Sequence, residues 1–403
     1  MFKLILKMAW KNSFARPART LLLIIMIAVS MSMMLGIEGL YDGMVLNMAD
    51  KSKRSDSGEI SIFAKEYRIN RDLKQRIADA KTIQKELQMM EGVRSVVLRV
   101  SADGLASTAR KSSFAQIRGV NLQEEESFGK FSDFLQEGEI NFSKRGAFVG
   151  VELAKTLKLK VGSKVIFSTQ DSSGEISSMV LKVAAIVQTT NIVLDTSTLF
   201  VDIKKVQKFL GLKEREATQI AIRTESEQLY ETLKKKYPTL DVKSFFELQP
   251  MIEMMEEMMV IFNSITFFIV MSVVFVGVFG VMYVSVLDRI REFGIMLSIG
   301  MQYKQIRLQI YLEAMFIGLF GFVSGGIIGL FLLIYLRDYG LDFSAFADAL
   351  QSWGYETIIY GTIKFSYFST TFFAIMSASL LSVIIPLRKI KKLNPIEVIK
   401  ADK

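Results

Sequence analysis

The stretch that decides the fold is VIFNSITFFIVMSVVFVGVFGVMYVSVLDRIREFGIMLSIGM, residues 260–301. Residues 260–287 carry no charged side chain, and about 20 apolar residues suffice to cross the hydrocarbon core of a membrane. The character then changes abruptly, since Asp288, Arg289, Arg291 and Glu292 lie within five positions. The stretch predicts a helix that leaves a bilayer at residue 288 and enters a short charged segment.

Three further apolar runs are long enough to span a bilayer, and they lie at residues 20–40, 308–336 and 366–387. Half of the residues are hydrophobic, which is more than a soluble domain of this size requires. Lys and Arg precede the first run, as in a signal peptide, but the run is too long and no small-residue cleavage site follows it. We therefore expect four membrane-spanning helices, the first of them a retained anchor.

The charge distribution predicts the orientation of these spans. Residues 1–19, 288–307 and 388–403 together carry fifteen basic and four acidic residues, whereas residues 43–258 carry 33 basic and 30 acidic ones. Short cytoplasmic segments are enriched in Lys and Arg. We therefore place both termini and the 288–307 segment in the cytoplasm and the large segment outside. The net charge of +9 is then a signal of topology, and we expect no nucleic-acid partner.

The composition excludes several kinds of chemistry. The chain has no Cys and no His, which excludes disulfides, thiolate or imidazole zinc sites, and Cys or His catalysis. No phosphate-binding G-x-x-x-x-G-K-[ST] motif and no G-x-S-x-G motif is present. A carboxylate-only ion site remains possible, although nothing has the spacing of a calcium loop. We expect no enzymatic active site and no metal or cofactor bound by this chain.

The outer segment has the pattern of a mixed α/β domain, arranged in one or two lobes. Residues 58–67 and 92–107 alternate like strands, while residues 72–90 have helical spacing. A second lobe is predicted over residues 131–201, with a strand, a short helix, a turn and two further strands. Residues 217–245 then predict a strand, a helix and a strand that return the chain to the first lobe.

The second span continues outward as a stalk. Residues 251–287 contain no Pro and two Gly, so they predict one unbroken helix of about 55 Å at 1.5 Å per residue. A bilayer core is only about 30 Å thick. The excess must stand above the membrane and carry the outer domain.

The first residues predict a helix of their own. Lys3, Lys7 and Lys11 follow at steps of four, and Trp10 lies among apolar residues on other faces. Such a helix can lie in the membrane surface with its lysines near anionic headgroups. The alternative is an ordinary basic flank before the first span.

The 288–306 segment has a spaced pattern formed by Arg289, Glu292, Phe293, Gly294, Ile295, Ile299, Gly300 and Ile306. This pattern resembles the coupling segment of the FtsX/MacB/LolC-type permeases of ABC transporters, with Ser298 in place of a usual Ala, and three further motifs resemble theirs. PLRKIKKLNPIEVIK (386–400) resembles their C-terminal ending, and VGVELAKTLKLKVGSKVIF (149–167) their outer-domain signature. AWKNSFARPARTLLLI (9–24) resembles their entry into the first span, with Ala15 where Arg is frequent. The four occur in the order found in the family.

The resemblance implies a membrane protein of four transmembrane α-helices with a large mixed α/β extracytoplasmic domain of two lobes between the first and second helix. It implies these parts: a cytoplasmic amphipathic helix (1–18), the first span and stalk (19–48), a periplasmic α/β domain (49–249), a stalk and second span (250–287), a cytoplasmic coupling helix (288–307), the third span (308–337), a periplasmic loop (338–365), the fourth span (366–387) and a cytoplasmic tail (388–403). The 340–363 excursion resembles, loosely, a loop of the lipoprotein-releasing branch and is expected to hold a short amphipathic helix with Phe343, Phe346 and Trp353.

The same resemblance implies partners. A separate cytoplasmic ATPase dimer would bind ATP and Mg and receive the coupling helix, and a second permease chain, identical or related, would complete the membrane part. Motion, rather than a substrate channel, would connect the two sides of the bacterial inner membrane. The residues implied in ATPase coupling are Arg289, Arg291, Glu292, Phe293, Gly294, Leu297 and Gly300.

The methionines suggest a substrate cleft. Methionines of the first helix could face those of the second, and flexible thioethers make adaptable apolar surfaces suited to acyl chains. The candidate cleft consists of Met31, Met34, Met44, Met48, Met251, Met255, Met258 and Met259. The alternative is a packed stalk.

The third span contains one ionisable residue and three regularly spaced glycines. Glu313 is expected to be a tether that reaches Arg307 or the 288–307 segment, since a charge at this depth is costly. Gly321, Gly325 and Gly329 are spaced by four residues and predict a face for close helix packing.

Three functions fit the resemblance. The one we expect is the release of lipoproteins from the inner membrane to a periplasmic carrier, because the chain most resembles the LolC/LolE branch, and the other two are alternatives. The second is MacB-like efflux through a periplasmic adaptor and an outer-membrane duct. The third is FtsX-like control of a cell-wall hydrolase, which the long outer segment disfavours because FtsX-like proteins usually have a small outer domain.

Overall fold

The computed structural model describes residues 2–142, 146–189, 191–226, 228–346 and 357–391. The chain divides into two compact units. The helical unit comprises residues 1–44, 256–343 and 358–403, and the α/β unit comprises residues 45–255 and 344–357.

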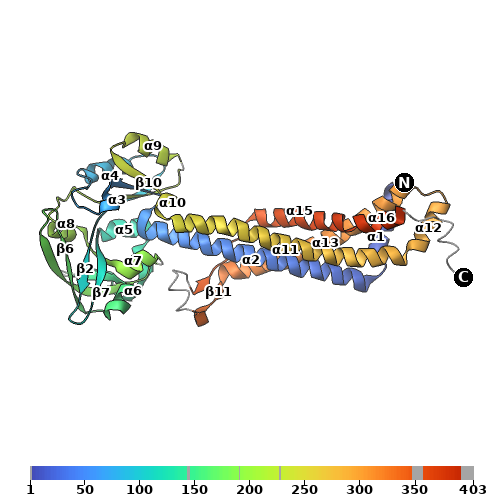
Figure 1. The fold of residues 1–403 in the computed structure, drawn as a ribbon, viewed down its shortest axis with the longest axis horizontal. Helices are drawn as coiled ribbons and strands as arrows, with labels where there is room; N and C mark the ends of the chain where they lie inside the picture. Colours follow the sequence, from blue (N-terminus) through green and yellow to red (C-terminus); the bar gives the residue numbers. More distant parts are fainter. Residues whose placement is uncertain (1, 143–145, 190, 227, 347–356, 392–403) are drawn as a thin grey trace. The chain divides into compact units, whose positions relative to one another are not determined.

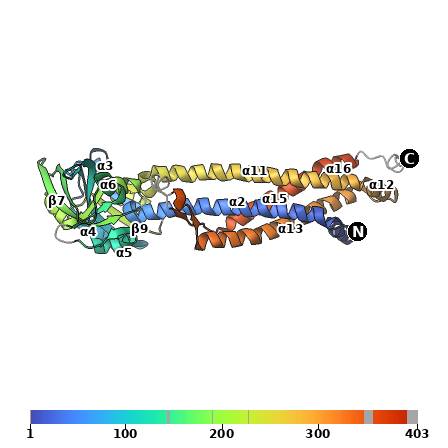
Figure 2. The same ribbon diagram turned by 90° about the horizontal axis from the view of Figure 1, so that it is seen from below.

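Four long helices build the helical unit, and they run side by side in Figures 1 and 2. They are α2 (Pro17–Ser52), α11 (Pro250–Asp288), α13 (Tyr303–Asp338) and α15 (Phe365–Ser382), the last followed by α16 (Ile384–Lys391). Among the described residues, these are the helices long and apolar enough to cross a membrane by length and composition. The expected unbroken helix through the second span is confirmed, since α11 runs for 39 residues.

Small residues bring α13 close to α2. A Cβ atom added to Gly325 would lie 2.9 Å from the Cα of Ala28, and one added to Gly321 would lie 2.6 Å from a methyl carbon of Ile27. Real Cβ contacts are not this short, so only glycine fits between the two backbones. The predicted packing face of the third span is confirmed.

The predicted N-terminal helix is present as α1 (Phe2–Ser13), which packs on α13. Ile5 and Ala9 are buried against Leu312. The ring of Trp10 meets Phe316 edge-on at 5.4 Å between ring centroids. Phe2, Leu4 and Trp10 remain exposed, and the position of this helix in a membrane surface stays a prediction.

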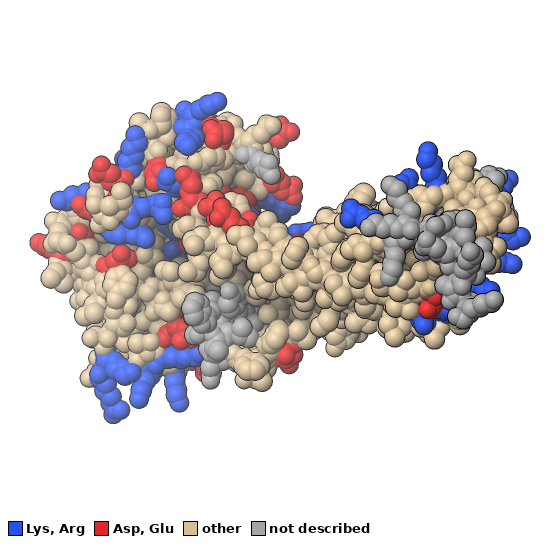
Figure 3. All heavy atoms as spheres, turned by 45° about the vertical axis from the view of Figure 1, so that its right-hand side comes forward, with Lys and Arg blue, Asp and Glu red and all other residues tan. Residues whose placement is uncertain are grey.

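Charge is distributed unevenly over the helical unit. The face of its helices seen in Figure 3 is almost entirely uncharged, and Lys and Arg gather at the end that carries α1 and α12 (Ile290–Ser298). An uncharged band bounded by basic residues is typical of a protein that spans a membrane.

The described parts of the connection between α13 and α15 include two short paired strands. They form a two-stranded ladder of β11 (Leu341–Asp342) and β12 (Ile358–Ile359), with the 3₁₀ turn η3 (Ser344–Phe346) after β11. Phe343 lies between β11 and η3, whereas Trp353 lies outside the described residues. Phe346 ends η3, and because residues 347–356 lie outside the described residues, the amphipathic helix stays a prediction.

One sheet runs through the α/β unit. Its strands are β1 (Ile60–Ala64), β2 (Val93–Ser107), β3 (Ser112–Val120), β4 (Leu135–Gly138), β5 (Gly146–Gly150), β6 (Lys164–Gln170), β7 (Ile176–Val187), β8 (Thr198–Asp202), β9 (Gln219–Thr224) and β10 (Leu240–Ser244). The order is β10-β1-β9-β2-β3-β8-β5-β7-β4, and β6 pairs with both β2 and β7. The strands from β2 to β7 are thereby closed into a ring by β6.

Short helices cover this sheet. They are η1 (Lys53–Ser57), α3 (Tyr67–Asn70), α4 (Ala80–Gln88), α5 (Leu122–Gly129), η2 (Phe131–Phe134), α6 (Val151–Leu157), α7 (Ile192–Ser197), α8 (Ile203–Phe209), α9 (Leu229–Lys236) and α10 (Phe245–Leu248). One apolar cluster joins side chains from most strands, among them Ile62, Val100, Ile117, Phe167 and Ile220.

The two predicted lobes share strand β2. Its first half pairs with β9, and its second half pairs with β3 and β6. As expected, β9 and β10 return to the first lobe, where both pair with β1. The predicted helix over 72–90 is shorter, since only α4 is helical there.

Candidate functional site

The charged segment between α11 and α13 folds as a tight helix–turn–helix around α12. The turn depends on Gly300, whose φ of +94° lies in the left-handed region that glycine tolerates best. The amide of Gly300 donates to the carbonyl of Leu297 at 3.1 Å. Gln302 caps the N-terminus of α13, and its amide donates to the Gln305 side chain at 2.9 Å.

One face of α12 is fixed inside the helical unit. Phe293 is fully buried and Gly294 is buried beside it. Met296 and Leu297 are partly buried against the apolar cluster that contains Ile306. This face serves the unit's own packing and is not available to a partner.

A buried ion pair fastens the start of α12 to α13. Arg289 donates to both carboxylate oxygens of Glu313, at 3.1 and 3.0 Å, and the Glu313 side chain is 5% exposed. The Gln309 amide also donates to Glu313, at 3.1 Å. Arg289 lies 5.0 Å from the ring centroid of Phe293 and pairs with Glu292 at 3.1 Å. One guanidinium nitrogen of Arg289, Nη1, makes both contacts to Glu313, while Nε donates to Glu292.

A second charged contact ties the end of α11 to the start of α2. Asp288 accepts hydrogen bonds from Arg16 and from Arg19, the latter at 2.9 Å. These side chains are a third to a half exposed, so each pair contributes modestly to stability. Together with the Arg289 pair, they connect three long helices to α12.

The other face of α12 points outward and is partly apolar. Ile295 is 49% exposed and Ile299 is 79% exposed. They are four residues apart and so lie on one side of the helix. Arg291 and Glu292 are exposed near them. Apolar anchors at this spacing are typical of a helix that docks in a groove of another protein.

The structure divides the seven residues predicted for coupling. Arg289, Phe293 and Gly294 face the interior and Leu297 is half-buried, whereas Arg291, Glu292 and Gly300 are exposed. Ile295 and Ile299 are not among these seven, although the sequence predicts that they form, with Met296 and Leu297, an apolar patch able to dock in a groove of a partner. The contact of Asp288 with Arg16 and Arg19 was not predicted, because the charge pattern gave no signal for it.

The expected tether at Glu313 has a definite partner. The partner is Arg289 of the 288–307 segment, and not Arg307, which is exposed. A carboxylate inside an apolar run was the signal that identified Glu313.

The candidate methionines occupy different environments. Met31 and Met34 are buried, Met44, Met48, Met255 and Met259 are half-buried, and Met251 and Met258 are exposed. Met31 lies against Gly325 and Gly326 of α13. This removes Met31 from the predicted cleft, since it fills the contact between α2 and α13. The other members stay a prediction.

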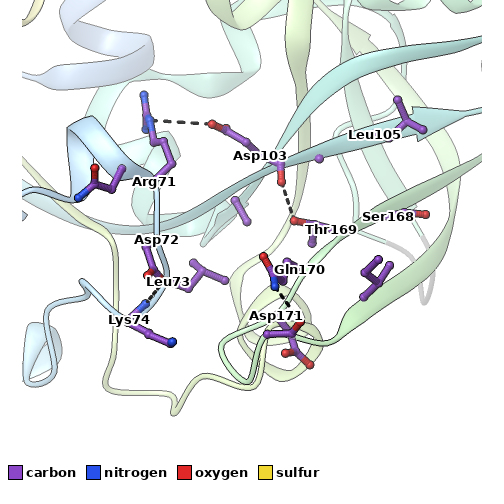
Figure 4. A pocket seen from close by; sticks show the side chains of 15 residues that line it. Arg71, Asp72, Leu73, Lys74, Asp103, Leu105, Ser168, Thr169, Gln170 and Asp171 are labelled. Carbon is purple, nitrogen blue, oxygen red and sulfur yellow. Dashed lines mark hydrogen bonds and ion pairs between the residues drawn. The ribbon is translucent and has the colours of Figure 1, made fainter.

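The α/β unit contains a hollow of about 830 Å³ where β6 joins β2 (Figure 4). Arg71 approaches Asp103 at 4.0 Å, and the Thr169 hydroxyl donates to the Asp103 carbonyl at 2.5 Å. The lining of this hollow includes no paired nucleophile and base. Among the described residues, no group of three or more acidic side chains could hold a metal ion.

Two family patterns match the chain. Residues 20–239 match the MacB-like periplasmic core domain, and residues 264–395 match the FtsX-like permease C-terminal region. The first match covers more than half of the sequence. The chain belongs to the family with the MacB-like periplasmic core domain.

Two similar proteins carry export names. The macrolide export ATP-binding/permease protein MacB of Chlorobium luteolum is 22% identical over 425 residues, which is 97% of this chain and 59% of that protein. The macrolide export ATP-binding/permease protein MacB 2 of Aeromonas hydrophila subsp. hydrophila is 32% identical over 125 residues, which is 30% of this chain and 16% of that protein. The chain thus spans 59% or less of the length of these relatives.

Solved structures with weaker similarity include the periplasmic region of MacB from Actinobacillus actinomycetemcomitans. It is 16% identical, with a TM-score of 0.33, over 48% of this chain and 92% of that one.

The MacB-like match begins within α2 and covers the α/β unit as far as the end of α9, so it stops before β10. The protein is accordingly a multi-pass membrane permease chain of the MacB/FtsX type, with four long apolar helices and a mixed α/β periplasmic domain between the first and second. The FtsX-like match contains α12, Glu313 and the remaining long helices.

Proposed function

We propose that this chain is the membrane subunit of an ABC transporter and that α12 docks in a groove of a separate cytoplasmic ATPase. The observation that supports this best is the division of α12 into two faces. Ile295 and Ile299 point outward, while Arg289 fastens the helix to Glu313 of α13. A docking element that must transmit force needs both an exposed anchor and a firm attachment.

In the proposed mechanism the chain transmits movement. Because α11 crosses the membrane between the periplasmic domain and α12, the segment around α12 and both termini are on the cytoplasmic side. ATP and Mg bind to the partner ATPase, and its closure displaces α12. The Arg289–Glu313 pair passes the displacement to α13, and the contacts of Asp288 with Arg16 and Arg19 pass it to α2. Both α2 and α11 are unbroken helices that include residues of both units.

We propose export, in the manner that the relatives' names indicate, as the work done. A second permease chain and a periplasmic adaptor would complete the assembly in the bacterial inner membrane. The support is the similarity to proteins named for macrolide export, one of which aligns over 97% of this chain.

Lipoprotein release is a second candidate, which a surface of α11 favours. Met251, Met254 and Met258 are exposed along this helix, and their flexible side chains suit acyl chains. A periplasmic carrier would then take the place of the adaptor and duct. FtsX-like control of a hydrolase has no such supporting observation.

Reconstitution tests these proposals in order. The tagged chain is expressed with each ATP-binding subunit of its host in turn, and the pairs that form are placed in liposomes. We expect one pair to hydrolyse ATP faster than the ATPase alone. Efflux of a macrolide or transfer of a labelled lipoprotein to a soluble acceptor then decides the cargo. If no ATPase pairs with the chain, the proposed coupling is wrong.

A further inference from the structure

At the end of the helical unit away from α12, the return segment 358–364 crosses α2 at very close range. The amide of Thr362 donates to the carbonyl of Gly39 at 2.9 Å, and the amide of Gly361 donates to Leu336 at 3.0 Å. A Cβ atom on Gly43 would collide with the carbonyl oxygen of Tyr360. The segment is therefore clamped between α2 and α13, and we call residues 358–364 the clamp segment.

A buried polar network lies beside the clamp segment. Asp42 of α2 accepts hydrogen bonds from Lys364 and from the Tyr367 hydroxyl, and it is 5% exposed. The Thr362 hydroxyl lies 3.2 Å from the Tyr367 hydroxyl. Because Tyr367 donates its proton to Asp42, its oxygen accepts from Thr362. Asp42 therefore accepts hydrogen bonds from two residues near the start of α15, and the positive charge of Lys364 stabilises its carboxylate.

Glu38 lies one turn earlier on α2 and has no such partners. It is 8% exposed, and its Oε2 atom is buried without a hydrogen bond. The titratable groups that face Glu38 are Asp42 on its own helix and Tyr367 on α15. From α13 the nearby helix face presents Leu332 and Leu333. No described cation offsets a second negative charge here beyond Lys364, which already pairs with Asp42.

An ionised carboxylate is expensive in this setting. A buried charge without a partner tends to be neutralised, and a charge within a membrane span is rarely kept without a function. A second carboxylate one turn away adds repulsion. A proton neutralises the carboxylate of Glu38 and needs almost no space. The protonated side chain also gains an O–H group that can donate a hydrogen bond.

We propose that Glu38 is a proton-binding site and that its protonation holds the clamp segment closed on α2. When the proton leaves to water on the outer side, Glu38 and Asp42 both carry negative charge and share one lysine. Movement of the clamp segment away from α2 admits water to both carboxylates, which lowers the cost of the second charge, and it breaks the hydrogen bond from Thr362 to Gly39. This proposal does not depend on the nature of the cargo or on the ATPase.

Hydrogen–deuterium exchange on the full-length chain in nanodiscs tests the proposal. Exchange in peptides that cover the clamp segment is followed from about pH 5 to about pH 9 and corrected for the intrinsic pH dependence of exchange. We expect exchange to rise about tenfold with pH in the wild type. In Glu38→Gln, whose amide is neutral and of the same shape, it should stay low at every pH. Glu257→Gln, an exposed change on α11, is the matched control and should behave as the wild type.

Two results would overturn the proposal. One is a flat, unchanged exchange profile in the wild type, and the other is a Glu38→Gln profile that rises as the wild type does. Sodium chloride is compared with choline chloride, because sodium-dependent closure at high pH would assign the site to a metal ion instead. If Glu38→Gln does not fold, the infrared carbonyl band of a protonated glutamic acid in the ¹³C-Glu-labelled wild type serves in its place. A band that does not disappear over the pH range in which the clamp segment opens contradicts the proposal.

Discussion

At the scale of single residues, the account depends most on the pair of Arg289 and Glu313. Both side chains are largely buried, and the removal of one partner from such a pair leaves an uncompensated charge that costs roughly 3–5 kcal/mol. Glu313→Gln should therefore lower the melting temperature in detergent and abolish stimulated ATP hydrolysis.

Stability and coupling can be separated with a double variant. Apolar residues of similar size often replace a buried ion pair at little cost. Arg289→Met combined with Glu313→Leu should recover most of the melting temperature. Transport per ATP hydrolysed should nevertheless remain low, because the ion pair no longer fixes the orientation of α12 relative to α13. If the double variant transports normally, the pair only packs and has no part in coupling.

A substitution at the exposed end of α12 should affect ATPase binding and leave the stability of the chain almost unchanged. Ile299 is 79% exposed, so Ile299→Asp should change the free energy of unfolding by about 0.5 kcal/mol or less. It should nevertheless weaken ATPase binding at least about tenfold, since a charge would enter an apolar groove. Pull-down with the ATPase measures this. Ile69→Asp, at an equally exposed residue of the α/β unit, is the control.

These residues also show the limit of reasoning from a pattern. The spacing of residues 288–306 predicts that one helix face is apolar, but it does not tell which face turns inward. Phe293 and Ile295 are both apolar and differ by two positions, yet one is fully buried and the other is half exposed. The partner of Arg289 is 24 residues away, and only the fold brings it near.

At the scale of elements, the packing of α2 on α13 requires glycine at one position and tolerates change beside it. Gly325→Val should lower the melting temperature markedly, by roughly 1–3 kcal/mol of stability, because its Cβ atom would press on the backbone of Ala28. Gly326→Val meets only the flexible end of Met31 at 3.5 Å and should be mild. Equal effects would contradict the packing described.

The unbroken course of α11 can be tested directly. Val260 is exposed within this helix, so Val260→Pro removes little packing but breaks the helix at a cost of about 3 kcal/mol. We expect ATPase binding to persist while transport is lost. Val260→Ala, which keeps the helix, should transport as the wild type. Normal transport by the proline variant would argue against a rigid helix as the transmitting element.

Elements with a clear period were predictable from the sequence, and the others were not. The strands of residues 60–64 and 219–224 and the helix of residues 229–236 follow the expected patterns. Residues 72–79 were expected to be helical, but the amide of Ile77 donates to Ala217 at 2.8 Å, and this bridge replaces a helical bond. Strand β8 was not predicted from the sequence, because its apolar run is short and buried on both faces and so shows no alternation.

Over the whole chain, the apolar runs predicted the four spans and the periodicity of residues predicted the mixed α/β domain, both of which the family matches support. The sharing of β2 between two halves of the sheet was not predictable, since it depends on pairings between strands distant in sequence. The work done on cargo is likewise a property of the assembly and is not contained in one chain.

The most direct test of the central claim uses the absence of cysteine from this sequence. The variant Ile299→Cys therefore carries a single cysteine. It is treated with a membrane-impermeant maleimide from either side of sealed vesicles, with and without the partner ATPase. The account predicts labelling from the cytoplasmic side alone, protection by the bound ATPase, and a crosslink to that subunit. Labelling from the periplasmic side, or unchanged labelling with the ATPase bound, would contradict it.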